Sequence, residues 1–219
     1  MRGVSHFLFS TLNGILIMKK LVLTLALVAG AASLSHAQGV KLGVKAGASY
    51  ANVTGDDTED AKYKFGFNAG LTANFGFSDL LSFQPELLYS QKGFQFEDDA
   101  IDLKVKQTYH YVDVPLLLRI NADGPFFELG PQVGVLLGQK SKVTVDGDDV
   151  DSDSDSDLDG YNRVDFGYIA GLGYQLESGL SVGVRYNGGI GSIFENNDDS
   201  GKVRNSVFQL QLGYLFGGK

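Results

Sequence analysis

The chain has 219 residues, a formal net charge of −8 and no cysteine. The missing cysteine excludes disulfides, thiolate metal sites and cysteine nucleophiles, and the negative charge argues against nucleic acid as a partner. Loss of a leader holding Arg2, Lys19 and Lys20 removes three positive charges and takes the net charge from −8 to −11. One domain of roughly 180 residues then remains.

The N-terminal segment has the pattern of a secretory signal peptide. Two lysines precede an apolar run over 21–32, and small residues stand before Gln38. The run is too short to cross a bilayer as a helix. We therefore predict a cleavable signal peptide over 1–37, of which 1–17 is an upstream extension from a misplaced start codon, followed by a mature domain over 38–219.

From residue 40 onward, large apolar residues alternate with small or polar ones. Within 63–77, for example, odd positions carry Tyr, Phe, Ala and Leu, whereas even positions carry Lys, Gly, Asn and Thr. A period of two predicts β-strands with two unlike faces. The pattern predicts eight strands, over 40–50, 63–77, 80–92, 105–120, 126–138, 163–176, 180–190 and 203–216.

The connections between these strands alternate between long and short, and the acidic residues follow them. Of the 26 Asp and Glu, 19 fall in four long segments, namely 51–62, 97–104, 139–162 and 191–202. The short connections carry turn residues. We therefore predict an all-β fold, an eight-stranded antiparallel up-and-down transmembrane β-barrel in the bacterial outer membrane, with periplasmic termini and acidic loops outside.

A competing interpretation is a secreted soluble barrel or sandwich, which also alternates with period two. It would pack the aromatic-rich face into a barrel just wide enough for side chains. It would also expose to water a face made mainly of glycine and few charges. Both faces fit the opposite arrangement, in which the rings face lipid and the glycines face a narrow lumen.

Two further features of the predicted strands concern their ends and their regularity. Aromatic residues near the strand ends predict interfacial girdles. One rim has Tyr50, Tyr63, Tyr89, Tyr109, Tyr161 and Tyr186, and the other has Phe77, Phe83, Phe127, Tyr174, Tyr214 and Phe216. Because proline donates no ladder hydrogen bond, we expect bulges or kinks at Pro85, Pro115 and Pro131.

Five stretches resemble a known family of small barrels. They read QPELLYSQKG at 84–93, VPLLLR at 114–119, GPQVG at 130–134, VRYNGG at 184–189 and FQLQLGYLF at 208–216. In these stretches the chain resembles the PorT-like outer-membrane β-barrel proteins common in Bacteroidetes. The resemblance implies an eight-stranded barrel in the outer membrane. It implies little about activity, although the family's namesake is linked to protein secretion across that membrane.

Charged residues on the glycine face form the candidate site. The predicted inward residues are Glu86, Lys92, Asp113, Arg119, Glu128, Arg163, Asp165 and Arg185. Unpaired charge in a narrow lumen is costly, so we expect Arg185 and Arg119 to be the hubs for Glu86, Glu128 and Asp113. The network either plugs the lumen or forms a gated, ion-selective pore. Eight strands favour the plug.

The third long loop, 146–160, has eight aspartates and no base. It is either a solvated acidic loop or a weak calcium site, since Asp155, Asp157 and Asp159 match the first half of an EF-hand loop. The match is partial, because the position of the bidentate glutamate is Phe166. The predicted partners are outer-membrane lipid and lipopolysaccharide, with divalent cations at this loop.

The predicted mature chain has one histidine, His110, between Tyr109 and Tyr111 on the outward face. This position is typical of a membrane girdle rather than of catalysis, so we predict no catalytic residue and no cofactor. The first hypothesis is a monomeric, non-enzymatic barrel with a structural or surface-contact role. The alternatives are a small channel or a component of a secretion system, and an outer-membrane enzyme.

Overall fold

The strands of the computed structural model form one antiparallel sheet. The structure describes residues 40–56, 58–98, 100–145, 148–155, 158–195 and 201–217, with the backbone alone for 149–155. The predicted signal peptide lies outside these residues. In the described part the strands are β1 (Val40–Gly55), β2 (Lys64–Gly76), β3 (Leu81–Asp98), β4 (Leu103–Asn121), β5 (Pro125–Val145), β6 (Asp148–Asp155), β7 (Val164–Gln175), β8 (Leu180–Gly189) and β9 (Val203–Leu215). No helix in this part is long and apolar enough to cross a membrane.

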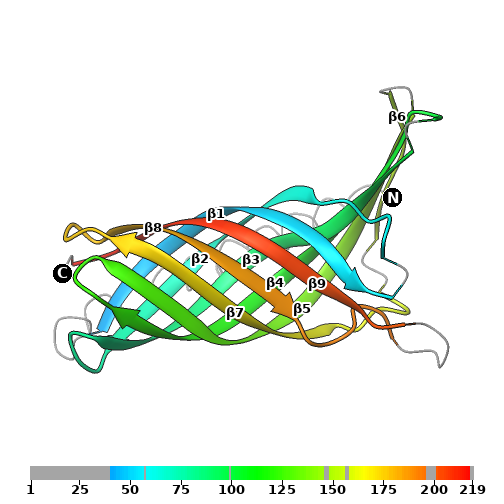
Figure 1. Cartoon of the computed structure of the whole chain (residues 1–219). Helices are drawn as coiled ribbons and strands as arrows, with labels where there is room; N and C mark the ends of the chain where they lie inside the picture. Colours follow the sequence, from blue (N-terminus) through cyan, green and yellow to red (C-terminus); the bar gives the residue numbers. More distant parts are fainter. Residues whose placement is uncertain are drawn as a thin grey trace, which may run out of the picture.

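Eight of these strands close into a barrel (Figure 1). In this ring β1 to β5 pair in sequence order, β5 pairs with β7, β7 with β8 and β8 with β9, and β1 pairs with β9 to close it. All pairings are antiparallel, so the predicted eight-stranded barrel is confirmed. The start of β1 and the end of β9 lie at one end of the barrel in Figure 1, and the long connections lie at the other.

The long-loop end contains more strand than the sequence predicts. β6 lies within 139–162, which we predicted to be loop, and it pairs with the outer part of β5. Residues 93–98 of β3 and 103–108 of β4 pair in the same way. Together with 139–145 and β6 they form a four-stranded extension, here called the outer sheet, whose β5–β6 hairpin rises beyond the barrel (Figure 1). Because Asp and Ser have low strand propensity, the sequence of β6 carries no strand signal of its own.

The two faces of the barrel separate as the alternation predicts. Large apolar side chains are exposed on the outside, for example Phe65 at 79%, Leu129 at 62% and Leu212 at 58%. Polar side chains such as Asn68 and Gln84 are buried at 0–1% on the opposite face. Exposure of so large an apolar surface to water is unfavourable, whereas lipid acyl chains would cover it.

The predicted bulges at the prolines are wrong. Pro85, Pro115 and Pro131 all lie in ladders whose register is the same on both sides of the proline. A proline removes one donor, and the neighbouring pairs hold the register without it. The β4–β5 ladder shifts instead between His110 and Tyr111, at the border of the outer sheet.

Most of the predicted girdle residues at the long-loop end lie on the outside, but two do not. Tyr50 stacks on Tyr63 with ring centroids 4.5 Å apart. Tyr109, in contrast, is 1% exposed. It lies four residues from the inward Asp113 on β4 and therefore shares its strand face. The ring of Tyr161 packs against that of Tyr109 at 5.8 Å. Both tyrosines therefore close the end of the lumen instead of lying in the lipid interface.

Candidate functional site

Four charged side chains meet in the middle of the lumen and form the central network. Arg185 Nη1 lies 2.8 Å from Glu86 Oε2, and Arg185 Nη2 lies 2.7 Å from Glu128 Oε1. Lys45 Nζ lies 2.5 Å from Glu86 Oε1 and 3.7 Å from Glu128 Oε2. The residues come from β8, β3, β5 and β1, none of which pairs with another of the four. The ion pairs therefore cross the lumen, and their two positive and two negative charges balance.

A glycine makes room for the central network. A Cβ atom at Gly171 of β7 would lie 2.9 Å from Arg185 Cβ and 3.1 Å from Glu128 Oε1. Contacts this short would displace both ion-pairing side chains. The glycine face of the strands thus has a specific use here, since it gives long charged side chains space in a narrow barrel.

A second cluster lies nearer the long-loop end. Lys92 Nζ lies 3.0 Å from Asp113 Oδ1 and 3.3 Å from Asp165 Oδ2, and it sits 4.4 Å from the ring centroid of Tyr111. Asn205 Nδ2 donates a hydrogen bond of 3.0 Å to Asp165 Oδ2. All three charged side chains are 0–5% exposed. One lysine therefore holds two buried carboxylates, and an asparagine supplies a further donor.

Arg119 is not the hub that we predicted. Its guanidinium donates to Gln84 Oε1 at 3.1 Å and to Gln175 Oε1, and its central carbon lies 3.6 Å from the ring centroid of Phe126. Glu128 stands directly opposite Arg119 in the β4–β5 ladder, but its ion pairs are those of the central network. Arg119 thus caps the lumen near the short turns through neutral partners.

Two further outcomes concern Arg163 and Lys45. Arg163 is exposed just before β7, outside both clusters, where its carbonyl accepts a hydrogen bond of 2.8 Å from Leu136 N.

Lys45 is in the central network and the sequence reasoning missed it. It could have been found, because it has the same parity as Gly43 and Gly47 on the glycine face of β1.

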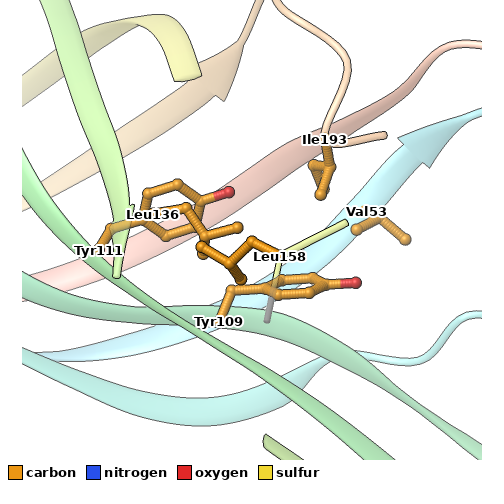
Figure 2. Close-up of a cluster of buried hydrophobic side chains, with 6 residues drawn as sticks. All are labelled: Val53, Tyr109, Tyr111, Leu136, Leu158 and Ile193. Carbon is orange, nitrogen blue, oxygen red and sulfur yellow. The ribbon is translucent and has the colours of Figure 1, made fainter. Parts of the chain in front are cut away.

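The long-loop end of the lumen is covered by an apolar cluster, here called the apolar lid, which the sequence reasoning also missed. Figure 2 shows its buried residues facing one another, namely Val53, Tyr109, Tyr111, Leu136, Leu158 and Ile193. Leu158 and Ile193 come from the two long connections that follow β6 and β8. Asn162 Nδ2 joins these connections by donating to the carbonyls of Ser192 at 3.0 Å and Phe194 at 2.9 Å.

The opposite end of the lumen opens into a vestibule lined mainly by polar residues. A cavity of about 450 Å³ opens between the short turns and is lined in part by Asn74, Ser82, Asn121 and Gln175. Arg119 donates to both Asn121 Oδ1, at 2.9 Å, and Gln175 Oε1. The vestibule therefore ends at the layer of Arg119, beneath the central network.

The predicted calcium site falls mostly outside the described side chains. Asp157 and the side chain of Asp155 are not described, and Asp159 is exposed. Among the side chains that the structure does describe, no group of three or more His, Asp or Glu is arranged to hold a metal ion. His110 faces outward, where its Nδ1 lies 2.6 Å from the hydroxyl of Tyr89.

A closed antiparallel barrel with an apolar exterior and a charged, filled interior defines a membrane-spanning β-barrel of the small outer-membrane class. The chain belongs to the family described as "Outer membrane protein beta-barrel domain", whose profile matches residues 32–195. It is therefore an outer-membrane β-barrel protein. Among curated proteins, none matches this chain.

Several solved outer-membrane barrels are similar to the chain. Ail, the attachment invasion locus protein of Yersinia pestis, is 20% identical, with a TM-score of 0.43 over 80% of this chain and 98% of Ail. Neisserial surface protein A is 16% identical, with a TM-score of 0.46 over 81% and 99%. OprG of Pseudomonas aeruginosa is 14% identical, with a TM-score of 0.39 over 80% and 95%.

Proposed function

We propose that this protein is a non-enzymatic outer-membrane barrel with a filled lumen, and that its long-loop end makes contacts at the cell surface. The observation that supports this most is the stack of buried ion pairs beneath the apolar lid. A solute would have to break ion pairs that cross the lumen, which is costly when one partner is left buried and uncompensated. The outward position of His110, bonded to Tyr89 in the girdle, argues against catalysis.

The proposal includes an orientation in the membrane. We infer that the short turns and both termini face the periplasm after cleavage of the signal peptide over 1–37, and that the barrel is a monomer. The long loops and the outer sheet then face outward, as small bacterial barrels generally arrange them. We also assign the chain to the PorT-like branch on the stretches at 84–93 and 208–216. A secretion role is not carried over with them, because function belongs to sites rather than to folds.

Planar-bilayer recording of the refolded chain tests the filled lumen. We expect no stable conductance steps at either polarity. The matched variant replaces Lys45 and Glu86 with serine, which keeps the charge balance, and Ile193 with glycine, which opens the apolar lid. This variant should conduct if it keeps heat-modifiable gel mobility, the sign of a folded barrel. Uniform steps from the natural sequence would instead identify a channel, the alternative function.

The surface-contact role is tested by trimming the β5–β6 hairpin. Deletion of 139–162 is unsuitable, because it would also remove Leu158 and Tyr161 from the apolar lid and its packing. Replacing 143–151 with a two-residue turn joins the paired residues Lys142 and Ser152, and it keeps the barrel ladder and the lid. We expect this variant to fold with unchanged heat-modifiable mobility while cells that carry it lose attachment to surfaces. Unchanged attachment would leave the protein with a structural role alone.

A further inference from the structure

The vestibule at the short-turn end lies over a buried charge that has no counter-ion in the protein. Arg119 of β4 is 1% exposed. The buried bases of the two clusters, Lys45, Lys92 and Arg185, each lie within 3.0 Å of a carboxylate oxygen. Among the ion pairs of the described side chains, none includes Arg119. A buried charge without a counter-charge is unfavourable, so this end of the lumen is suited to an anion.

The central network does not neutralise Arg119. Glu128 stands opposite Arg119 in the β4–β5 ladder, but its carboxylate pairs with Arg185 and Lys45. Together with Glu86, these side chains form a set whose two positive and two negative charges balance. Adding Arg119 leaves one positive charge in excess at this level of the lumen. The compensating anion must therefore come from outside the barrel.

The guanidinium of Arg119 is held with its N–H groups toward the vestibule. Its central carbon lies 3.6 Å from the ring centroid of Phe126, which covers one flat side and leaves the donors free to bond in the plane. Nε donates to Asn121 Oδ1 at 2.9 Å, and Nη2 donates to Gln175 Oε1. Asn121 and Gln175 both line the cavity of about 450 Å³. Two side-chain amides therefore separate the guanidinium from the vestibule.

Gln175 is placed so that an anion can replace it. It is the last residue of β7, and its side chain is half-buried. Rotation of this flexible side chain would free Arg119 Nη2 without disturbing the ladder. A carboxylate forms a stronger hydrogen bond with a guanidinium than a neutral amide does, and it can bond to two N–H groups at once. Arg119 thus offers a better bond to a carboxylate than to its present partner.

The other side chains of the vestibule suit a ligand rich in hydroxyl groups. Asn74 donates a hydrogen bond of 3.0 Å to Ser82 Oγ, and both residues line the cavity together with Ser78 and Asn121. Amide and hydroxyl side chains both donate and accept, as the hydroxyl groups of a sugar do. Small-molecule sites have volumes of about 300–1,000 Å³, and the cavity of about 450 Å³ lies in this range. It therefore has room for a single sugar ring.

The mouth of the vestibule limits the charge of the ligand. Asp79 and Asp123 lie in short turns, and Lys41 lies at the start of β1. Asp123 and Lys41 make further contacts of their own, and Asp79 is exposed. An exposed carboxylate repels an incoming anion, and the repulsion grows with the charge of that anion. The mouth thus disfavours phosphate dianions and polyanions relative to a ligand with one carboxylate.

We propose that the vestibule binds a sugar acid with one carboxylate, which bonds to Arg119 while the hydroxyl groups bond to Asn74, Ser82 and Asn121. The site is separate from the proposed surface contacts, which lie at the other end of the barrel. Because the central network fills the lumen above Arg119, the ligand enters and leaves through the short-turn end. In the orientation given above, it comes from the periplasm.

Titration of the refolded, isotope-labelled chain with glucuronate tests this. The measurement is the NMR shift of the Arg119 Nε–H group and of the side-chain amides of Asn121 and Gln175. We expect saturable shifts with glucuronate. Glucuronamide, which has the same ring without the charge, should bind about tenfold more weakly or worse, because it lacks the hydrogen bond between two charged groups. Acetate, which has the charge without the hydroxyl groups, should also bind more weakly.

Two variants with opposite expected effects test the role of Arg119. Arg119→Gln should lose about tenfold or more in affinity for glucuronate. Gln175→Ala keeps the guanidinium and removes the amide that competes for Nη2, so it should bind glucuronate about fivefold more tightly. Heat-modifiable mobility confirms folding of each variant. Should Arg119→Gln fail to fold, Gln175→Ala tests the same contact, and unchanged or weaker binding by Gln175→Ala would overturn the proposal.

The control variant is Arg163→Gln, which removes the same charge from an exposed position just before β7. Equal losses in Arg163→Gln and Arg119→Gln would reduce the effect to net charge and overturn the proposal. Equal binding of glucuronamide or acetate, tighter binding of inorganic phosphate, or shifts that do not saturate would overturn it as well. The conductance of the same samples is an independent readout, so failure here is distinct from failure of the proposed filled lumen.

Discussion

Arg185 holds the central network together, since it pairs with both Glu86 and Glu128 while its own side chain is 1% exposed. We predict that Arg185→Leu destabilises the barrel by about 3–5 kcal/mol, because it leaves buried carboxylates with Lys45 alone. The measurement is equilibrium urea unfolding in detergent, followed by gel mobility. Arg119→Leu is the control and should cost only about 1–3 kcal/mol, since its partners are neutral amides. Equal destabilisation by Arg185→Leu and Arg119→Leu would mean that the ion pairs of Arg185 stabilise the barrel no more than neutral hydrogen bonds do.

Glu97 offers a second test at the residue scale, in the outer sheet beyond the membrane. Hydrogen bonds from Lys104 and then Lys62 lower the pKa of this carboxyl below its usual value. Because the folded pKa is lowered, its stabilising contribution is present above the usual pKa of glutamate and is lost as the pH falls through the folded value. We predict that an NMR titration of the Glu97 side-chain carbonyl has a low midpoint that rises in Lys104→Gln. An unchanged midpoint in that variant would refute the pairing.

At the scale of elements, the apolar lid joins two long connections to the barrel mouth. Leu158 is 4% exposed and Ile193 is 1% exposed. We predict that Leu158→Ala and Ile193→Ala each cost about 2–3 kcal/mol and speed amide exchange in 158–162 and 191–195. Ile101→Ala is the control, because Ile101 is an exposed aliphatic residue in another loop, at 59%. Exchange that stays as slow as in the natural chain would mean that the lid does not hold these connections.

The strands could be predicted because one physical pattern governs every residue of the barrel wall. A lipid-facing residue such as Leu212 must be apolar and its neighbours Gln211 and Gly213 must fit the lumen, so parity alone assigns faces. The same alternation identifies the buried charges within the strands, and it would have found Lys45 too, but it fails for Arg163, which lies just before β7 and is exposed. Parity does not identify partners. The ion-pair partners predicted for Arg119 are wrong, because the alternation of residues along a strand gives no distances across the lumen.

The outer sheet and the apolar lid could not be predicted for a different reason. β6 is a strand because β5 offers it a complementary edge, whereas its Asp-Ser sequence favours no regular structure. Leu158 is the lone apolar residue in 151–159, and only the packing of Ile193 and Tyr109 beside it shows that it turns inward. Tertiary contacts decide both features, so neither has a local signal.

At the scale of the whole molecule, the two ends of the barrel differ in a way that fits one direction of insertion. The short-turn end has a polar vestibule, the start of β1 and the end of β9. The long-loop end has the apolar lid and the hairpin of β5 and β6. The hairpin and the long connections that would make surface contacts thus gather at one end, and a barrel inserted the opposite way would present them to the periplasm.

The absence of cysteine from the chain allows a direct test of this orientation. Ala100 and Ser178 are both exposed, in a long connection and in a short turn respectively. We predict that a membrane-impermeant maleimide labels Ala100→Cys but not Ser178→Cys on intact cells, because the outer membrane shields the periplasmic turn. Both variants should be labelled after lysis, which controls for reactivity. Labelling of Ser178→Cys alone on intact cells would reverse the orientation and place the β5–β6 hairpin in the periplasm.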